Sequence, residues 1–182
     1  MKKTTVAVFA GSSEGIFEEY KKDAYSLGEQ LAKNNCHTLW GGGKEGVMGA
    51  LMSGVCNNGG TMEAHIFEKW FSKDEKFPSA VTSVSSCKSE NDRNEIFLKA
   101  DFQVALAGGV GSLLEIAYAL NEKLYHQPQT PPLIILSSQN HWRDLDNLLH
   151  EIIVSKFGNN EIKKRINFFQ KPGEVIEAMT LS

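Results

Sequence analysis

Three glycine-rich turns constrain the fold of this chain most, because each follows a short apolar run and precedes a longer amphipathic segment. They lie at residues 11–15, 41–46 and 108–112. Short apolar runs that alternate with helical patterns are typical of βαβ units and of a parallel sheet. In such a sheet, the turns that follow the strands all lie at the carboxyl edge. The sequence therefore predicts that these turns come together in space.

The hydrophobic pattern predicts a complete α/β fold. We expect one domain over residues 1–182, with a doubly wound, Rossmann-like parallel sheet flanked by helices. Ser89 and Asp92 form an N-cap pattern, so a helix should begin there. Another helix carries apolar residues spaced by three and four from Phe17 to Leu31. Strands are expected at residues 4–10, 37–40, 61–66, 81–85, 102–106 and 133–136, with further helices at 46–56, 112–123, 142–157 and 174–179.

Composition limits the partners that this chain can attract. With 182 residues, 41% of them hydrophobic, it can bury a core without disulfides or metal. The net charge of −3 draws in neither nucleic acid nor an anionic membrane. The three cysteines form no CxxC pair, and no apolar stretch approaches the ~18 residues of a membrane span. We expect a cytoplasmic protein in which local chemistry binds any phosphate.

The glycine turns are candidate anion sites. Each offers unpaired backbone N–H groups at a helix N-terminus, and glycine lets a phosphate approach the backbone. A single turn of this kind is as readily explained as a tight connection between elements as by ligand binding. Three such turns at one edge of the sheet favour a binding site. Residues 41–46 also match the dinucleotide pattern GxGxxG, with Glu63 where a ribose-binding acid would lie, although this turn follows the second strand. No GxxxxGK[ST] motif is present, which disfavours a P-loop NTPase.

Two charged residues are candidates for the chemistry. Glu115 and Ser112 are three residues apart and share one helical face after the third turn. Ser112 can donate to a phosphate or cap the helix. Glu115 is either a favourable acid in the first helical turn or a group that binds ribose hydroxyls or positions a water. Arg93, on the preceding helix, can clamp a phosphate, polarise a leaving base, or simply cap its helix.

These stretches together resemble the LOG family, the cytokinin riboside 5′-monophosphate phosphoribohydrolases, many of which carry the label "lysine decarboxylase". The family signature PGGxGTxxE is similar to residues 107–115, and its GGGxxGLMG motif is similar to residues 41–49. The early motif of the family looks like residues 8–13, and an arginine before Ala100 matches Arg93.

The resemblance implies hydrolysis of the N-glycosidic bond of a nucleoside 5′-monophosphate, a cytokinin riboside monophosphate or an AMP-like nucleotide. The products would be a free base and ribose 5-phosphate. It also implies a homodimer, with no metal and no cofactor. Carried over by position, Arg93 and Glu115 are the catalytic pair. The substrate-binding residues are then Gly11, Ser12, Gly42, Gly43, Asn94, Gly108, Gly109, Gly111 and Ser112.

The chain departs from the family pattern at three positions. Ala107 replaces proline, Ser112 replaces threonine but keeps the hydroxyl, and Asn94 stands where the family commonly has lysine. Asn94 therefore removes one cation from the expected pocket. The alternative is a non-catalytic nucleotide or molybdenum-cofactor carrier of the same superfamily. A dinucleotide oxidoreductase is disfavoured, because the chain is too short for a separate substrate domain.

Other polar and aromatic side chains suggest less specific roles. The spacing of His37, His65 and His141 fits no metal site, so structural roles are expected. Trp70 and Phe71, in the charged and aromatic segment 68–78, either shield a base or anchor a loop or a dimer contact. Lys44 lies beside a glycine turn, where a solvated lysine is expected.

Overall fold

The computed structural model describes residues 3–72, 74, 76–127 and 129–180. Within these residues, seven strands form one parallel sheet in the order β4-β3-β2-β1-β5-β6-β7. The strands are β1 (Thr5–Phe9), β2 (His37–Trp40), β3 (Thr61–Phe67), β4 (Val81–Cys87), β5 (Phe102–Ala105), β6 (Leu133–Leu136) and β7 (Ile166–Phe169). The helices are α1 (Glu18–Lys33), α2 (Gly46–Asn57), α3 (Glu90–Leu98), α4 (Val110–Tyr125), α5 (Arg143–Val154), α6 (Glu161–Arg165) and α7 (Pro172–Thr180).

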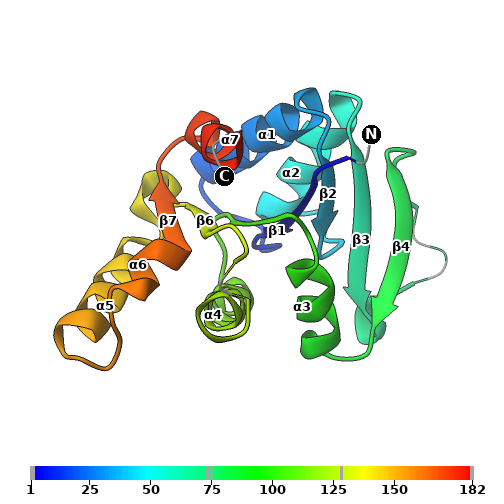
Figure 1. The fold of residues 1–182 in the computed structure, drawn as a ribbon. Helices are drawn as coiled ribbons and strands as arrows, with labels where there is room; N and C mark the ends of the chain where they lie inside the picture. The colour runs from blue at the N-terminus through cyan, green and yellow to red at the C-terminus, as the bar shows by residue number, and fades with distance from the viewer. Residues whose placement is uncertain (1–2, 73, 75, 128, 181–182) are drawn as a thin grey trace.

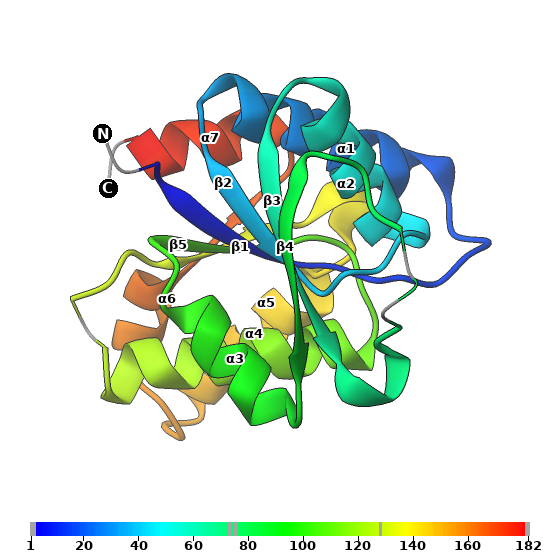
Figure 2. The same ribbon diagram turned by 90° about the vertical axis from the view of Figure 1, so that its right-hand side faces the viewer.

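Helices cover both faces of the sheet, as Figures 1 and 2 show. Helices α1, α2 and α7 lie on one face, and α3, α4, α5 and α6 lie on the other. Alternate residues of β1 enter the two cores: Val6 and Val8 pack under the first layer, and Ala7 and Phe9 under the second. The strand order reverses direction between β1 and β5, which makes this point the topological switch of the sheet. The predicted doubly wound α/β fold is confirmed.

Helices α1 and α2 pack so closely that two glycines are required between them. A Cβ on Gly28 would lie 2.5 Å from the Leu51 carbonyl oxygen, and one on Gly54 would meet the Tyr25 carbonyl. Only hydrogen fits at both positions. This packing brings the N-terminus of α2 toward the turn after β1, where Met48 N–H donates to Gly11 O at 3.0 Å.

The predicted start of α3 is confirmed by a capping box. Ser89 Oγ accepts the Asp92 N–H at 3.1 Å, and the Asp92 carboxylate accepts the Ser89 N–H at 3.0 Å. Two of the N–H groups at this helix end are therefore satisfied. Because α3 begins directly after β4, its first turn lies at the carboxyl edge of the sheet and carries Arg93 there.

The sequence patterns missed two elements near the C-terminus. Helix α6 and strand β7 were not expected, and the helix predicted at 142–157 ends at Val154. Strand β7 is short and pairs with β6 alone, and its Asn167 interrupts the apolar run. Within segment 68–78, Glu68–Trp70 forms a 3₁₀ turn, while residues 73 and 75 lie outside the described residues. Of the helices described, none has the length and apolar character needed to cross a bilayer.

Candidate functional site

The turns after β1 and β5 are hydrogen-bonded to each other at the switch point. Gly11 N–H donates to Ala107 O at 3.0 Å, and a Cβ on Gly11 would lie 3.1 Å from the Gly108 Cα. The backbone of the two turns therefore approaches as closely as glycine allows. Gly11 lines a cleft at the carboxyl edge of the sheet, whereas Ala107 and Gly108 line a cavity beside it.

The cleft has a volume of about 300 Å³ and contains most of the predicted site residues. Arg93 and Asn94 enter from α3, and Ser112 and Glu115 from α4. Its full lining is Ala10, Gly11, Ser12, Ser13, Met48, Phe67, Trp70, Glu90, Arg93, Asn94, Gly109, Val110, Gly111, Ser112, Leu114 and Glu115.

Three predicted binding glycines do not line this cleft. Gly42 has φ of +81°, and a Cβ there would overlap the Ile66 side chain. Gly43 faces Met48, whose sulfur would lie 2.7 Å from a Cβ. Gly108 lines a neighbouring cavity, and a Cβ there would collide with the Ser112 hydroxyl. In each case the packing of the turn already explains the glycine.

Arg93 and Glu115 form a buried ion pair at the centre of the cleft. Arg93 Nη2 donates to Glu115 Oε1 at 2.7 Å, and the two residues are only 9% and 4% exposed. The guanidinium also lies 4.0 Å from the centre of the Phe67 ring, within cation–π range. Arg93 follows β4 and Glu115 follows β5, and the two side chains meet although three strands separate β4 from β5 in the sheet.

Burial dominates the electrostatics of Glu115. Desolvation raises its pKa to about 7, and the charge and hydrogen bond of Arg93 oppose that rise only in part. Both protonation states are therefore populated near neutral pH. A carboxyl group of this kind can stabilise a positive charge when ionised and can exchange a proton with a bound molecule.

Two buried polar atoms in the cleft lack hydrogen-bond partners within the described residues. They are Arg93 Nε and Asn94 Oδ1. Both residues are more than nine-tenths buried and line the cleft. Buried polar atoms are nearly always paired in native proteins, so unpaired ones beside a cavity are suited to a ligand.

The N-terminus of α4 opens into the same cleft. Gly109 is the N-cap and provides no side-chain cap, and the first intrahelical bond runs from Leu113 N–H to Gly109 O. The preceding N–H groups of this turn are thus available to an anion. A Cβ on Gly109 or Gly111 would meet nothing within 4 Å, so packing does not require glycine at either position. Glycine there leaves the backbone open to a ligand.

Sequence reasoning missed several residues on the cleft wall, among them Met48, Phe67, Glu90 and Leu114. Phe67 is the last residue of β3 and so lies at the carboxyl edge, which is the signal that could have identified it. Trp70 lines the cleft, is 63% exposed and contacts Phe67 edge-to-face, with ring centres 5.4 Å apart. Phe71 instead packs against the core under α1 and α2.

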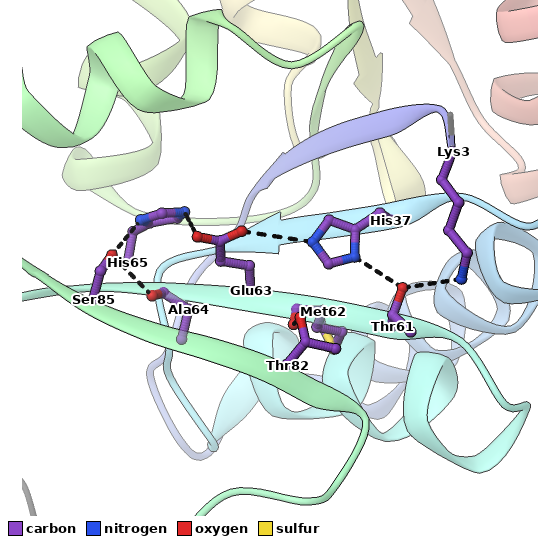
Figure 3. Close-up of polar contacts among 9 residues, drawn as sticks. All are labelled: Lys3, His37, Thr61, Met62, Glu63, Ala64, His65, Thr82 and Ser85. Atoms are coloured by element: carbon purple, nitrogen blue, oxygen red, sulfur yellow. Dashed lines mark hydrogen bonds and ion pairs between the residues drawn. The ribbon is translucent and has the colours of Figure 1, made fainter. Parts of the chain in front are cut away.

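Glu63 lies away from the cleft, in the middle of β3. Figure 3 shows its carboxylate between two histidines: His37 Nε2 is 3.7 Å from Oε2, and His65 Nε2 is 3.6 Å from Oε1. Burial lowers the pKa of His65, whose Nδ1 contacts Ser85 Oγ at 2.7 Å. Because β3 continues four residues beyond Glu63, this carboxylate does not reach the edge where a ribose would bind.

Over the ranges that the structure describes, no group of three or more His, Cys, Asp or Glu side chains is arranged to hold a metal ion. The Lys44 ammonium donates to Lys76 O at 2.8 Å and lies 4.3 Å from the Phe77 ring centre. It does not line the cleft, so Arg93 is the cation among the described lining residues.

Comparisons with known proteins agree with this architecture. The family model described as "possible lysine decarboxylase" matches residues 48–179. A probable cytokinin riboside 5′-monophosphate phosphoribohydrolase of Oryza sativa is 27% identical over 177 residues, covering 96% of this chain and 69% of the relative. A cytokinin riboside 5′-monophosphate phosphoribohydrolase of Rhodococcoides fascians is 24% identical, covering 89% of this chain and 82% of that protein. Among solved structures, the Moco carrier protein of Chlamydomonas reinhardtii has a TM-score of 0.74 at 22% identity and covers 99% of this chain and 97% of its own.

Proposed function

The chain belongs to the LOG family, whose model is described as "possible lysine decarboxylase", and on that premise we propose that it hydrolyses the N-glycosidic bond of a nucleoside 5′-monophosphate. The substrate would be a cytokinin riboside monophosphate or an AMP-like nucleotide. Water would add to the anomeric carbon of the ribose as the bond to the base breaks. The base would leave with a proton, and ribose 5-phosphate would be the second product.

The observation that carries the proposal is the buried Arg93–Glu115 pair, which lines the same cleft as the glycine turns. Glycosidic cleavage passes through a state with positive charge on the sugar ring. An ionised Glu115 would stabilise that charge in a site of low dielectric constant, or orient the attacking water. Arg93 would hold the carboxylate in place, and its unpaired Nε supplies a donor for the ligand.

Main-chain amides would bind the phosphate. The N–H groups of Gly109–Ser112 at the start of α4 offer a partial positive charge, and Ser112 adds a hydroxyl. Asn94 is uncharged where the family commonly has lysine, so phosphate binding would depend more on these amides. The unpaired Asn94 Oδ1 would accept a hydrogen bond from a hydroxyl or amine of the ligand.

A non-catalytic carrier is the second candidate. It is favoured by the likeness of the fold to a protein described as a Moco carrier protein. A carrier does not require a carboxylate of raised pKa beside the sugar. The presence of Glu115 in the cleft therefore favours the hydrolase.

The two candidates are separated by incubating the protein with a panel of nucleoside monophosphates that includes AMP, and measuring free base and ribose 5-phosphate. We expect cleavage by the unmodified protein and a loss of at least about 100-fold in Glu115→Gln. Glu122→Gln, on the same helix but outside the cleft, is the matched control and should retain activity. If the protein bound a nucleotide saturably but cleaved none of the panel, the hydrolase proposal would be rejected in favour of the carrier.

A further inference from the structure

A second cavity of about 220 Å³ adjoins the cleft across the glycine turns. It shares Gly11, Ser13 and Gly109 with the cleft. Its other walls come from α1, α2 and the segment after β6, whereas Arg93 and Glu115 come from α3 and α4. The second cavity therefore extends from the shared turns toward α1 and α2, on the side away from Arg93 and Glu115. The remaining lining residues of the second cavity are Ile16, Tyr20, Val47, Ala107, Gly108 and His141.

The second cavity differs in chemistry from the cleft. No Asp, Glu, Lys or Arg is among its described lining residues, and Ile16, Val47 and Ala107 are aliphatic. The aromatic wall is formed by Tyr20 and His141, whose rings meet edge-to-face with centres 5.4 Å apart. Such a wall suits an uncharged planar ring.

His141 is held in place by the backbone of the turn after β5. Its Nε2 lies 2.8 Å from Gly108 O and 3.2 Å from Gly108 N, so one tautomer donates to the carbonyl and the other accepts from the amide. The adjacent Trp142 ring packs edge-on at 4.8 Å. The imidazole is thus fixed before any ligand arrives.

We propose that the second cavity is a subsite for a planar, uncharged ring that is joined through a diphosphate to the nucleoside in the cleft. The ligand class is therefore a dinucleotide, bound across the switch point between β1 and β5, where doubly wound sheets bind their ligands. The diphosphate would lie over Gly109, which both cavities share. At about 220 Å³ the cavity would hold the ring of the second nucleotide, and its ribose would lie with the diphosphate over the turns. The proposal rests on the proposed function only in placing the nucleoside in the cleft, and it assigns no redox step.

The test compares NADH, whose dihydronicotinamide ring is planar and uncharged, with ADP-ribose, which lacks that ring. Binding is followed by NADH fluorescence, with ADP-ribose as competitor, and chromatography verifies that both ligands stay intact. We expect NADH to bind about three- to tenfold more tightly than ADP-ribose, as one aromatic contact provides. Tyr20→Ala should abolish that ratio, while Tyr25→Ala, an exposed tyrosine on the same helix, should keep it.

Equal affinities for the two ligands in the unmodified protein would overturn the subsite, as would a ratio that survives in Tyr20→Ala. Circular dichroism establishes that Tyr20→Ala is folded. If it is not, Ile16→Ala, in the loop before α1, provides the same comparison. The proposed function fails separately, if AMP is neither bound nor cleaved. Whether or not AMP is cleaved, the ratio of NADH affinity to ADP-ribose affinity decides the subsite.

Discussion

Glu115 should make the stability of the protein depend on pH in a way that one substitution removes. Its pKa is raised from 4.5 to about 7 by burial in the folded protein. Between these two values the folded state holds a proton that the unfolded state has released. The free energy of unfolding therefore falls as pH rises through this window. A shift from 4.5 to about 7 corresponds to about 3 kcal/mol.

The assay is urea unfolding of the wild-type protein and of Glu115→Gln, measured at intervals from pH 4 to pH 8. Glutamine has nearly the shape of the protonated acid but does not titrate. The difference in unfolding free energy should move by about 3 kcal/mol in favour of Glu115→Gln between pH 4.5 and 7, and should be flat outside that range. Groups that titrate equally in both proteins cancel. A difference that is constant with pH would show that Glu115 has an ordinary pKa, and the account of the cleft electrostatics would then be wrong.

Three further perturbations test separate parts of the structure. Gly109→Ala should keep the melting temperature within about 2 °C, because a Cβ there meets nothing within 4 Å. The same Cβ should block the approach of a phosphate to the backbone and so weaken AMP binding at least about tenfold. Unchanged AMP affinity in a titration would contradict the phosphate site. Ser89→Ala removes the capping box of α3 and should cost about 1 kcal/mol in urea unfolding, with Ser86→Ala in β4 as a control that leaves the cap in place. Gly28→Ala would bring a Cβ to 2.5 Å from the Leu51 carbonyl oxygen and should destabilise the protein by about 1–3 kcal/mol. Gly109→Ala is the control and should not have this effect. If Gly28→Ala were as stable as Gly109→Ala, the close packing of α1 and α2 would be refuted.

Much of the architecture could be predicted from sequence because it depends on local patterns. The bounds of β2 and β6 match the short apolar runs, and the capping pattern at Ser89 locates the start of α3. The meeting of Arg93 and Glu115 followed from one rule, that turns after parallel strands share an edge. The predicted homodimer and the cytoplasmic location stay predictions.

The features that could not be predicted depend on distances across the fold, which no local sequence pattern encodes. Phe67 and Trp70 reach the cleft because β3 extends beyond its neighbour β2, and that length was underestimated by one residue. Gly42 and Gly108 look like ligand-binding glycines in sequence, but contacts with Ile66 and Ser112 account for them. The raised pKa of Glu115 likewise arises from burial by several elements together.

The hydrogen bond between Gly11 and Ala107 has a consequence for how a ligand is admitted. Because the turns after β1 and β5 are tied together before binding, a ligand does not have to order them, and little conformational entropy is lost on that side. Adjustment on binding should be confined to the opposite wall, where the Trp70 ring is exposed and contacts Phe67 and the Lys69 ammonium. Tryptophan fluorescence on ligand addition should therefore report the movement of Trp70, while amide exchange at Gly11 stays slow throughout.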